Sequence, residues 1–335
     1  MPFTLPDGTC APAHSHVTEV GELEGAATNL PTRPLYQKKD LPMPTRTTAD
    51  VLQAHRAAGR FLSVDGLQTF VLDKGQGKPV LCLHGVPTSS YLYRKVIDEL
   101  ADRGLRGISF DLPGLGFTDR PADYGYSFDR LARFAARVTE ELGLDHYHLV
   151  VHDVGGPVGF ALAADHPDRV RSLTILNTWI DVVNFQKPLP MRPFELPVAG
   201  ELELAAMNHL TWQLVWKGLA VADTSGIPTE ESNAYVDLLK RDDGGAAFLK
   251  IMRNFADSEA FRDRCYRAVQ QVPYPMQAIW GSEDPGLTYE RYGEEIKRVA
   301  GLQAVHQLPA KHLLQEEQAG AIAEQVWRIA QLQGV

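Results

Sequence analysis

The sequence predicts an α/β fold in which a mostly parallel sheet carries helices on both faces and an inserted helical cap. From residue 60 onward, short apolar runs alternate with stretches of helical spacing, which is typical of a parallel sheet covered on both faces. Residues 179–273 interrupt this alternation with helical patterns alone. One apolar run, residues 147–152, ends abruptly in an acidic residue and a Gly-Gly-Pro step, which indicates a sharp turn between a strand and a helix.

The expected strands are short apolar runs that end in polar or turn-forming residues. Before the interruption we expect strands at 61–64, 69–72, 80–83, 107–110, 147–152 and 171–177. The helices expected between the later strands cover 91–102, 128–142 and 158–164. Helical patterns within the interruption occur at 202–219, 229–239 and 246–255. After it we expect strands at 276–281 and 304–305 and a last helix at 321–332.

The alternation and its interruption divide the chain into three parts. Residues 1–60 are expected to form an N-terminal extension, residues 61–178 and 274–335 the α/β core, and residues 179–273 the cap. Pro and Thr recur in the extension, and no sustained apolar periodicity occurs before about Val51. We therefore expect the extension to lack a hydrophobic core of its own.

Composition excludes several classes of function. The chain has 335 residues, of which 44% are hydrophobic and 22% charged, as in an ordinary globular protein. Its net charge of −9 is spread out without a basic stripe, which argues against binding to nucleic acid. We find no run of about 18 apolar residues and no secretory signal, so we expect a cytoplasmic protein without a membrane span. The sequence indicates no oligomeric state.

The cysteines and histidines predict neither a disulfide framework nor a metal site. Cys10, Cys82 and Cys265 are far apart and odd in number, which fits reduced thiols in a cytoplasm. Cys10, His14 and His16 are residue types that bind zinc, but no fourth ligand is evident, and a loose tail is the preferred interpretation. We therefore expect no metal ion.

The stretch from His148 to Pro157 predicts a buried strand, a sharp turn and the first turn of a helix. Gly155 and Gly156 let the backbone pass close to the strand, where a Cβ atom would clash. A proline suits the first helical turn, because its missing N–H would have no partner there. Such an elbow exposes its central side chain above the sheet, and here that side chain belongs to Asp153.

An aspartate at the elbow predicts nucleophilic catalysis. Its ordinary pKa is about 3.9, so the carboxylate is ionised at pH 7 without the help of a base. Carboxylates act as covalent nucleophiles in enzymes. Attack on a saturated carbon that carries a leaving group would form an alkyl ester of Asp153, which water must then cleave. The alternative interpretation is that Asp153 only caps the helix that follows.

Two polar residues in the second half of the chain are candidates for the acid and the base. Asp284 follows the expected strand at 276–281, and His312 follows the last expected strand. Because ligands of parallel sheets bind beyond the carboxyl ends of the strands, we expect both residues beside Asp153. A single histidine in a loop is usually a surface residue, but this position favours a base. Glu283 is a reserve candidate for the acid.

Three further segments carry recognisable motifs. Residues 81–95 read LCLHGVPTSSYLYRK, residues 110–121 read FDLPGLGFTDRP, and residues 312–316 read HLLQE. With the elbow, they resemble the α/β-hydrolase superfamily, specifically its branch of haloalkane dehalogenases and epoxide hydrolases, over most of the chain. Lys311 stands where this branch usually has Gly, and Asn177 stands where some dehalogenases place their acid, which an amide cannot replace. The resemblance implies an α/β-hydrolase fold, an order of nucleophile, acid and histidine, and no cofactor.

The resemblance also implies roles for individual residues. Asp153 would attack carbon and form the covalent intermediate. His312, oriented by Asp284, would then take a proton from the water that cleaves the ester. The backbone N–H groups of Val86 and Val154 would form the oxyanion hole, for which the side chain is irrelevant.

The leaving group is where the sequence departs from this branch. Haloalkane dehalogenases hold the departing halide with two side-chain N–H donors, but the usual positions carry Val154 and Val86, which cannot donate from their side chains. Trp212 resembles the donor from the cap, and its alternative interpretation is a core aromatic. Tyr235 resembles a cap tyrosine of epoxide hydrolases, which protonates the alkoxide, although dehalogenases also have tyrosines there.

The sequence therefore leaves three functional hypotheses. The first is a haloalkane dehalogenase-like hydrolase that cleaves the carbon–halogen bond of a small apolar substrate with water, as segment 81–95 and Trp212 suggest. The second is an epoxide hydrolase, which Tyr235 and the missing donor at Val154 favour. The third is a non-catalytic hydrolase-fold protein that binds a small apolar ligand. The complete set of three charged residues argues against the third, because a receptor needs none of them.

Overall fold

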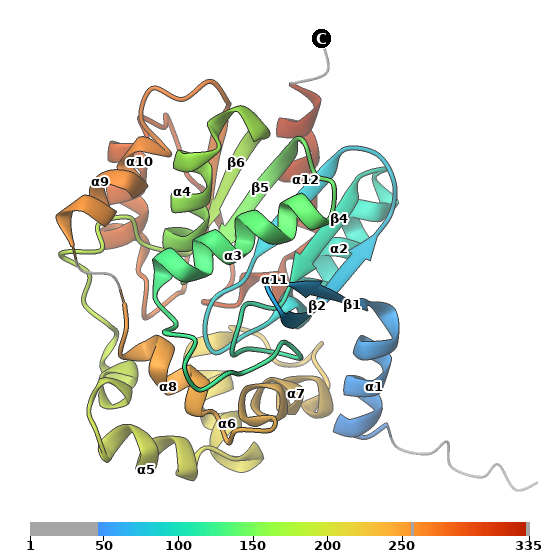
Figure 1. The fold of residues 1–335 in the computed structure, drawn as a ribbon, viewed down its shortest axis with the longest axis vertical. Coiled ribbons are helices and arrows are strands. Elements are labelled where there is room, and N and C mark those ends of the chain that lie inside the picture. Colours follow the sequence, from blue (N-terminus) through green and yellow to red (C-terminus); the bar gives the residue numbers. More distant parts are fainter. Residues whose placement is uncertain (1–45, 256–257, 333–335) are drawn as a thin grey trace, which may run out of the picture. The chain divides into compact units, whose positions relative to one another are not determined.

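The computed structural model describes residues 46–332 apart from 256 and 257. Its strands are β1 (Arg60–Val64), β2 (Leu67–Lys74), β3 (Pro79–Leu83), β4 (Arg106–Phe110), β5 (Tyr147–His152), β6 (Val170–Leu176), β7 (Met276–Gly281) and β8 (His306–Leu308). They form one sheet in the order β1-β2-β4-β3-β5-β6-β7-β8 (Figure 1). β2 pairs antiparallel with β1 and with β4, and all other neighbours are parallel. The predicted fold class is therefore confirmed.

The last strand lies two residues later than expected. β8 covers residues 306–308 instead of 304–305, and its register pairs Ile279 with His306 and Gly281 with Leu308. This strand lies at the edge of the sheet, and two of its three side chains are exposed. A strand at the edge of a sheet does not need an apolar sequence such as Ala304-Val305. Its position follows from hydrogen bonding to its single neighbour, β7.

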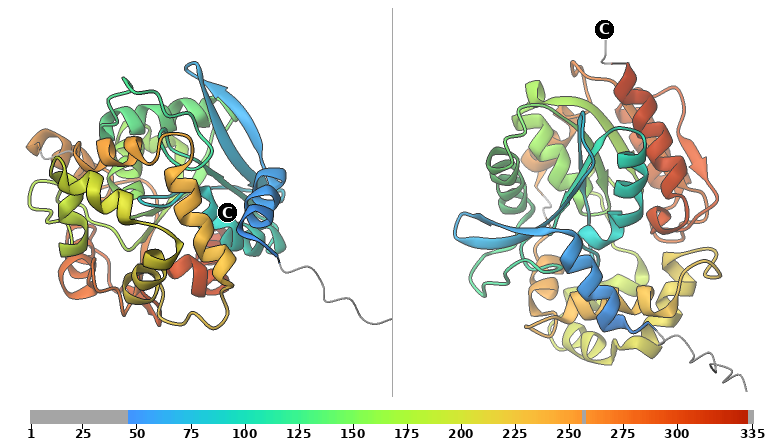
Figure 2. Two further views of the ribbon diagram at one scale, coloured as in Figure 1. Left: turned by 90° about the horizontal axis from the view of Figure 1, so that it is seen from below. Right: turned by 90° about the vertical axis from the view of Figure 1, so that its right-hand side faces the viewer.

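Helices cover both faces of the sheet (Figures 1 and 2). One face carries α3 (Phe128–Glu141), α4 (Gly155–Asp165) and α9 (Glu259–Arg267), and α4 contacts the other two. The opposite face carries α2 (Arg94–Asp102) and α12 (Ala319–Gln331), which contact each other. The shorter helices α10 (Glu294–Val299) and α11 (Leu314–Glu317) follow β7 and β8.

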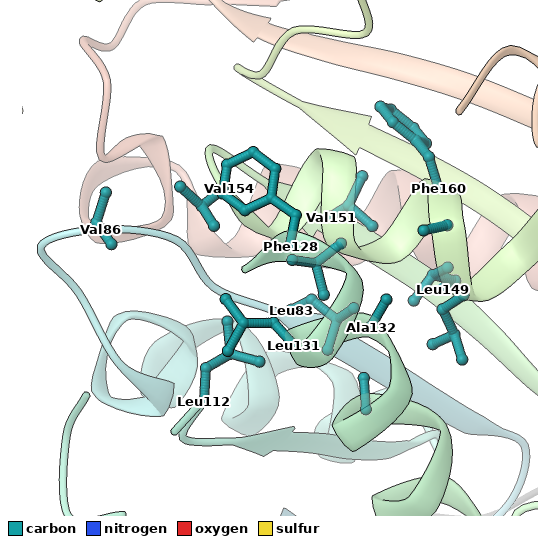
Figure 3. Packing of buried hydrophobic residues seen from close by; sticks show 14 of the residues in the cluster. Leu83, Val86, Leu112, Phe128, Leu131, Ala132, Leu149, Val151, Val154 and Phe160 are labelled. Atoms are coloured by element: carbon teal, nitrogen blue, oxygen red, sulfur yellow. The ribbon is translucent and has the colours of Figure 1, made fainter. Parts of the chain in front are cut away.

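Strand β5 lies at the centre of this arrangement, and all its side chains are buried. Leu149 and Val151 pack with the helices of the α3 and α4 face, whereas Val150 packs with those of the α2 and α12 face. Figure 3 shows Leu149 and Val151 among the side chains of Phe128 and Leu131 from α3. Because successive side chains of a strand point to opposite faces, a strand between two helical layers is buried on both faces.

Between β6 and β7 the described residues form helices and no strand. These helices are the 3₁₀ segment Leu189–Glu195, α5 (Ala199–Ala206), α6 (His209–Val215), a π-helical turn at Trp216–Ala220, α7 (Thr229–Lys240), α8 (Ala246–Met252) and α9. All but α9 lie at the lower end of the view in Figure 1. Within the part of the chain that is described, no helix is both long and apolar enough for a membrane span.

The helical pattern predicted at 202–219 is divided between α5 and α6, because Asn208 starts a new helix. The Asn208 side-chain oxygen accepts the N–H groups of Leu210 at 2.9 Å and Thr211 at 3.2 Å, and the Thr211 hydroxyl accepts the Asn208 N–H in return. This capping box satisfies the free donors of a helix N-terminus.

The described part of the expected extension contains a helix that the sequence analysis did not predict. Helix α1 (Thr48–Ala58) begins at a capping box in which Thr47 and Asp50 exchange hydrogen bonds. It contacts α7 of the cap (Figure 2). Arg46, just before the helix, pairs with Glu231 of α7 at 3.1 Å. The possible metal ligands Cys10, His14 and His16 lie outside the described residues.

Candidate active site

Asp153 stands at a strained turn between β5 and α4. Its φ of +51° lies in the left-handed region, which residues other than glycine seldom adopt. A Cβ atom at Gly155 would overlap the carbonyl oxygen of Leu83, and one at Gly156 would overlap the Thr178 hydroxyl. The Thr178 hydroxyl also donates a hydrogen bond to the Asp153 carbonyl oxygen at 2.6 Å. Glycine at both positions therefore allows the tight packing that keeps the turn in place.

The Asp153 carboxylate is surrounded by hydrogen-bond donors. Its Oδ1 atom accepts the N–H of Val86 at 2.7 Å, and the N–H of Val154 is a second backbone donor to the same group. Burial alone would raise the pKa of this carboxyl, but His312 and the Val154 N–H outweigh burial and lower it. Gly85 leaves room for the carboxylate, because a Cβ atom there would overlap Oδ1.

The imidazole of His312 lies between two carboxylates. Its Nδ1 atom is 2.8 Å from Asp284 Oδ2, and its Nε2 atom is 3.6 Å from Asp153 Oδ2. Burial would lower the pKa of His312, but the negative charges of Asp284 and Asp153 raise it to about 10. The imidazole is therefore a cation at neutral pH while both carboxylates are charged.

Asp284 is held by the loop that follows β7. Its Oδ1 atom accepts the N–H groups of Gly286 at 2.8 Å and Leu287 at 2.9 Å, and Oδ2 faces His312. Burial acts to raise the pKa of this carboxyl, yet the His312 charge and these hydrogen bonds lower it overall. Glu283, the reserve candidate, has an exposed side chain. The structure thus brings Asp284, and not its neighbour, to His312.

Asn177 is a site residue whose contribution the sequence analysis missed. It follows β6 and is fully buried. Its Nδ2 atom donates to Asp284 Oδ2 at 2.6 Å, and its Oδ1 atom accepts the N–H of Gly281 at 2.8 Å. Because both ends of the amide have partners, its orientation is fixed. Its position at a strand end was visible in the sequence, but we had considered it only as an acid.

His152 is a second residue that the sequence analysis did not assign. Its ring packs against that of His312 with centroids 4.7 Å apart, and its Nε2 atom lies 2.9 Å from the His312 carbonyl oxygen. Burial, with the nearby positive charge of His312, lowers the pKa of His152 to about 3. The ring is therefore neutral, and its Nε2–H can donate to that carbonyl.

A cavity of about 140 Å³ adjoins Asp153, Asp284 and His312. An engineered cavity of about 150 Å³ holds benzene, so this one fits a molecule of similar size. Its lining is mainly apolar and aromatic, and much of it comes from the cap: Phe185, Met191, Phe194, Trp212, Phe248 and Met252. Lys187 and Glu203 are the other charged residues of the lining. No group of three or more described His, Cys, Asp or Glu residues could hold a metal ion.

The structure treats the two predicted leaving-group residues differently. Trp212 lines the cavity, but its indole N–H donates to the carbonyl oxygen of Ser232 at 2.7 Å. Tyr235 is not among the residues that line the cavity, because its hydroxyl donates to the buried carboxylate of Glu316. The structure therefore brings the three charged residues and the two backbone donors together, and it leaves Tyr235 outside the cavity.

Comparison with known proteins identifies the family of this chain. Residues 78–319 match the family model described as alpha/beta hydrolase fold, and the chain therefore belongs to that family. Haloalkane dehalogenases 1 and 2 of Mycobacterium bovis (strain ATCC BAA-935 / AF2122/97) are 30% and 28% identical over 261 residues. These matches cover 74% and 75% of this chain and 82% and 87% of the two relatives.

A solved structure of an epoxide hydrolase shares the fold of this chain. The epoxide hydrolase VrEH1 from Vigna radiata has a TM-score of 0.67 and 22% identity, with 82% of this chain and 97% of that chain covered. At this identity the likeness concerns the fold alone. Within its family, the chain belongs to the branch of haloalkane dehalogenases and epoxide hydrolases, as its motifs predicted.

Proposed function

We propose that this protein is a haloalkane dehalogenase-like hydrolase that cleaves a carbon–halogen bond through a covalent ester of Asp153. The observation that carries the proposal is the cavity. The cavity combines a nucleophilic carboxylate and an imidazole with a mainly apolar lining. Among the described residues that line it, none has a hydroxyl or thiol group in its side chain. A small apolar halide fits such a site, because its leaving group needs no proton. Asp153, Asp284 and His312 form the proposed catalytic triad.

The first step forms the ester. Asp153 Oδ1 accepts the Val86 N–H, so Oδ2 is the oxygen that is free to attack carbon. A bond forms between Oδ2 and carbon, the carbon–halogen bond breaks, and the halide leaves with the bonding electron pair. Oδ1 becomes the carbonyl oxygen of the ester and stays in the oxyanion hole of Val86 and Val154.

The second step depends on the change of charge at Asp153. Before attack, the carboxylates of Asp284 and Asp153 hold His312 as a cation, with a pKa of about 10. The ester is neutral, so one cause of the raised pKa disappears and the imidazolium releases its proton to solvent. Neutral His312 then takes a proton from water as that water attacks the ester carbonyl carbon. Collapse of the tetrahedral intermediate releases the alcohol and restores the Asp153 carboxylate.

Epoxide hydrolysis is the second candidate function, and one residue favours it. Opening of an epoxide gives an alkoxide, which needs a proton donor. Tyr235 donates to Glu316, but Glu203 lines the cavity and burial raises the pKa of its carboxyl. Glu203 would supply that proton only in its protonated form, which this shift favours. The third hypothesis, a non-catalytic binding protein, gives no reason for two buried carboxylates beside a charged imidazole.

A substrate panel tests the proposal. The purified full chain is incubated with 1-chloro-, 1-bromo- and 1-iodobutane and with styrene oxide, and released halide and diol are both measured. We expect halide release that Asp153→Asn abolishes, because an amide is a poor nucleophile. Diol formation without halide release would favour the epoxide hydrolase. Ligand binding that survives Asp153→Ala, without turnover of any compound, would favour the binding protein.

A trapping experiment tests the mechanism itself. His312→Gln removes the base and should permit the first step but stall the second, because no group then activates water. Intact-mass analysis of this variant with 1-bromobutane should show a butyl adduct, and peptide mapping should locate it at Asp153. An unmodified mass in a variant that still binds the substrate would contradict the covalent scheme.

A further inference from the structure

Trp179 combines burial, contact with the cavity and an unpaired donor. It lies after β6, directly beyond Thr178, and is only 1% exposed. Trp179 is among the residues that line the cavity that contains Asp153. Its Nε1–H has no hydrogen-bond partner among the described residues. Buried donors in native proteins are nearly always paired, so an unpaired one calls for an explanation such as a missing ligand.

Each of the other polar side chains of the lining that carries an N–H has at least one partner within the protein. The indole of Trp212 donates to a backbone carbonyl, and the Val86 N–H donates to the nucleophile. Both ring nitrogens of His312 face carboxylates. The ammonium group of Lys187 pairs with Glu195 at 2.5 Å. Within the described lining, the Trp179 indole N–H is therefore the buried side-chain donor that has no partner at all.

Two aromatic neighbours hold the Trp179 ring in a fixed plane. It stacks on Phe185 with centroids 3.8 Å apart and planes 10° apart, and on Phe255 with centroids 5.6 Å apart and planes 15° apart. Both phenylalanines also line the cavity. Offset stacking of this kind restrains the orientation of a ring. A donor that is held in advance stabilises developing charge without reorganisation during the reaction.

We propose that the Trp179 indole N–H donates a hydrogen bond to the halide that leaves the carbon attacked by Asp153. This inference rests on the proposed function and names the leaving group for which the site is built. The carbon–halogen bond breaks, the halide takes the electron pair, and the indole keeps its proton. Trp179 would thus supply, from the end of β6, the side-chain donor that neither Val86 nor Val154 can provide.

The same donor discriminates between the two candidate reactions. A departing halide is stable as an anion, so a hydrogen bond is sufficient to assist it. An alkoxide from an epoxide must gain a proton, and an indole N–H is far too weak an acid to give one at neutral pH. Trp179 therefore favours cleavage of a carbon–halogen bond over cleavage of the carbon–oxygen bond of an epoxide.

The test is Trp179→Phe, which keeps an aromatic ring in the stack and removes the N–H. Rates of halide release are compared for 1-chloro-, 1-bromo- and 1-iodobutane, and inhibition by added sodium bromide is measured in parallel. We expect the rate for the chloride to fall about tenfold or more, and that for the iodide to fall less, because chloride is the stronger hydrogen-bond acceptor and the poorer leaving group. Bromide should inhibit the variant more weakly than the unaltered chain.

The outcomes separate this inference from the proposed function. Halide release by the unaltered chain supports the function, whatever the variant does. A uniform loss for all three halides, or unchanged inhibition by bromide, would indicate a packing role for Trp179 and overturn the inference alone. No halide release by the unaltered chain would overturn both. If Trp179→Phe does not fold, incorporation of 3-benzothienylalanine, which replaces only the N–H by sulfur, gives the same comparison.

Discussion

The charged residues at the strand ends stabilise one another's ionised forms. The pKa of His312 is raised to about 10, and those of Asp153 and Asp284 are lowered, although burial opposes all three shifts. The opposite charges are therefore strong enough to overcome desolvation. In the proposed mechanism, this arrangement keeps Asp153 ionised for the attack on carbon, and it keeps His312 protonated until the ester has formed.

The raised pKa of His312 predicts how stability depends on pH. A histidine whose folded-state pKa exceeds its unfolded value of about 6.5 contributes stability that is fully present below pH 6.5. That contribution is lost as the pH rises toward the folded-state value of about 10. We therefore expect the difference in unfolding free energy between the unaltered chain and His312→Gln to shrink between pH 6.5 and 10.

Urea denaturation of both proteins at several pH values measures this difference. The carboxylates titrate below this window, since their pKa values in the folded protein are lowered, so they do not disturb the comparison. A difference that stays constant from pH 6.5 to 10 would mean that His312 is not a cation in the folded protein.

At the scale of elements, a buried charge network connects the cap to the core. Glu316 of α11 has no exposed side-chain surface and accepts hydrogen bonds from Arg94 of α2 at 2.9 Å and from Tyr235 of α7. Arg94 also donates to Glu231 of α7 at 2.7 Å. Burial would raise the pKa of Glu316, but the positive charge of Arg94 lowers it. Tyr235 therefore joins α7 to the core instead of lining the cavity.

This network predicts unequal effects on stability. Glu316→Gln removes the fully buried counter-charge of Arg94, which keeps only the partly exposed Glu231, and should reduce the free energy of unfolding by roughly 3 kcal/mol. Tyr235→Phe removes one hydrogen bond and should cost only about 1–2 kcal/mol. Urea denaturation of both variants checks the order. Equal losses would mean that the charge of Glu316 does not hold the network together.

At the scale of the whole molecule, the proposed substrate site lies between the sheet and the cap. The core provides the charged residues at the ends of β5 and β7 and after β8, and the cap provides most of the apolar lining. The size of the cavity is therefore set by how the cap helices pack over the sheet. The cavity volume of about 140 Å³ predicts a preference for substrates close to benzene in size.

Met252 of α8 offers a way to test this limit. Its side chain lines the cavity and is 1% exposed, so Met252→Ala should enlarge the space at a cost in stability of about 2–5 kcal/mol. Halide release from a series of 1-bromoalkanes should peak near butane to hexane for the unaltered chain and shift to longer chains for the variant. An identical profile for both would show that Met252 does not limit the substrate.

Most of the sheet and the charged residues of the site could be predicted from the sequence, because their signals are local. A buried strand is a continuous apolar run, as in residues 147–152, and the elbow is marked by Gly155 and Gly156 beside Asp153. Helix α1 was missed because its apolar face is short, and only Val51 and His55 are buried. The edge strand β8 was misplaced because its pairing, and not its hydrophobicity, decides its position.

The sequence by itself determined the fold class, the family and the three charged residues at the strand ends. Only the tertiary structure decided which donors are available to a ligand, because hydrogen-bond partners come from elements that are distant in the chain. Trp212 and Tyr235 have the right chemistry, but Ser232 and Glu316 engage them, whereas the N–H of Trp179 has no described partner. The residue type determines which hydrogen bonds a side chain can donate, and the packing determines which acceptor it meets.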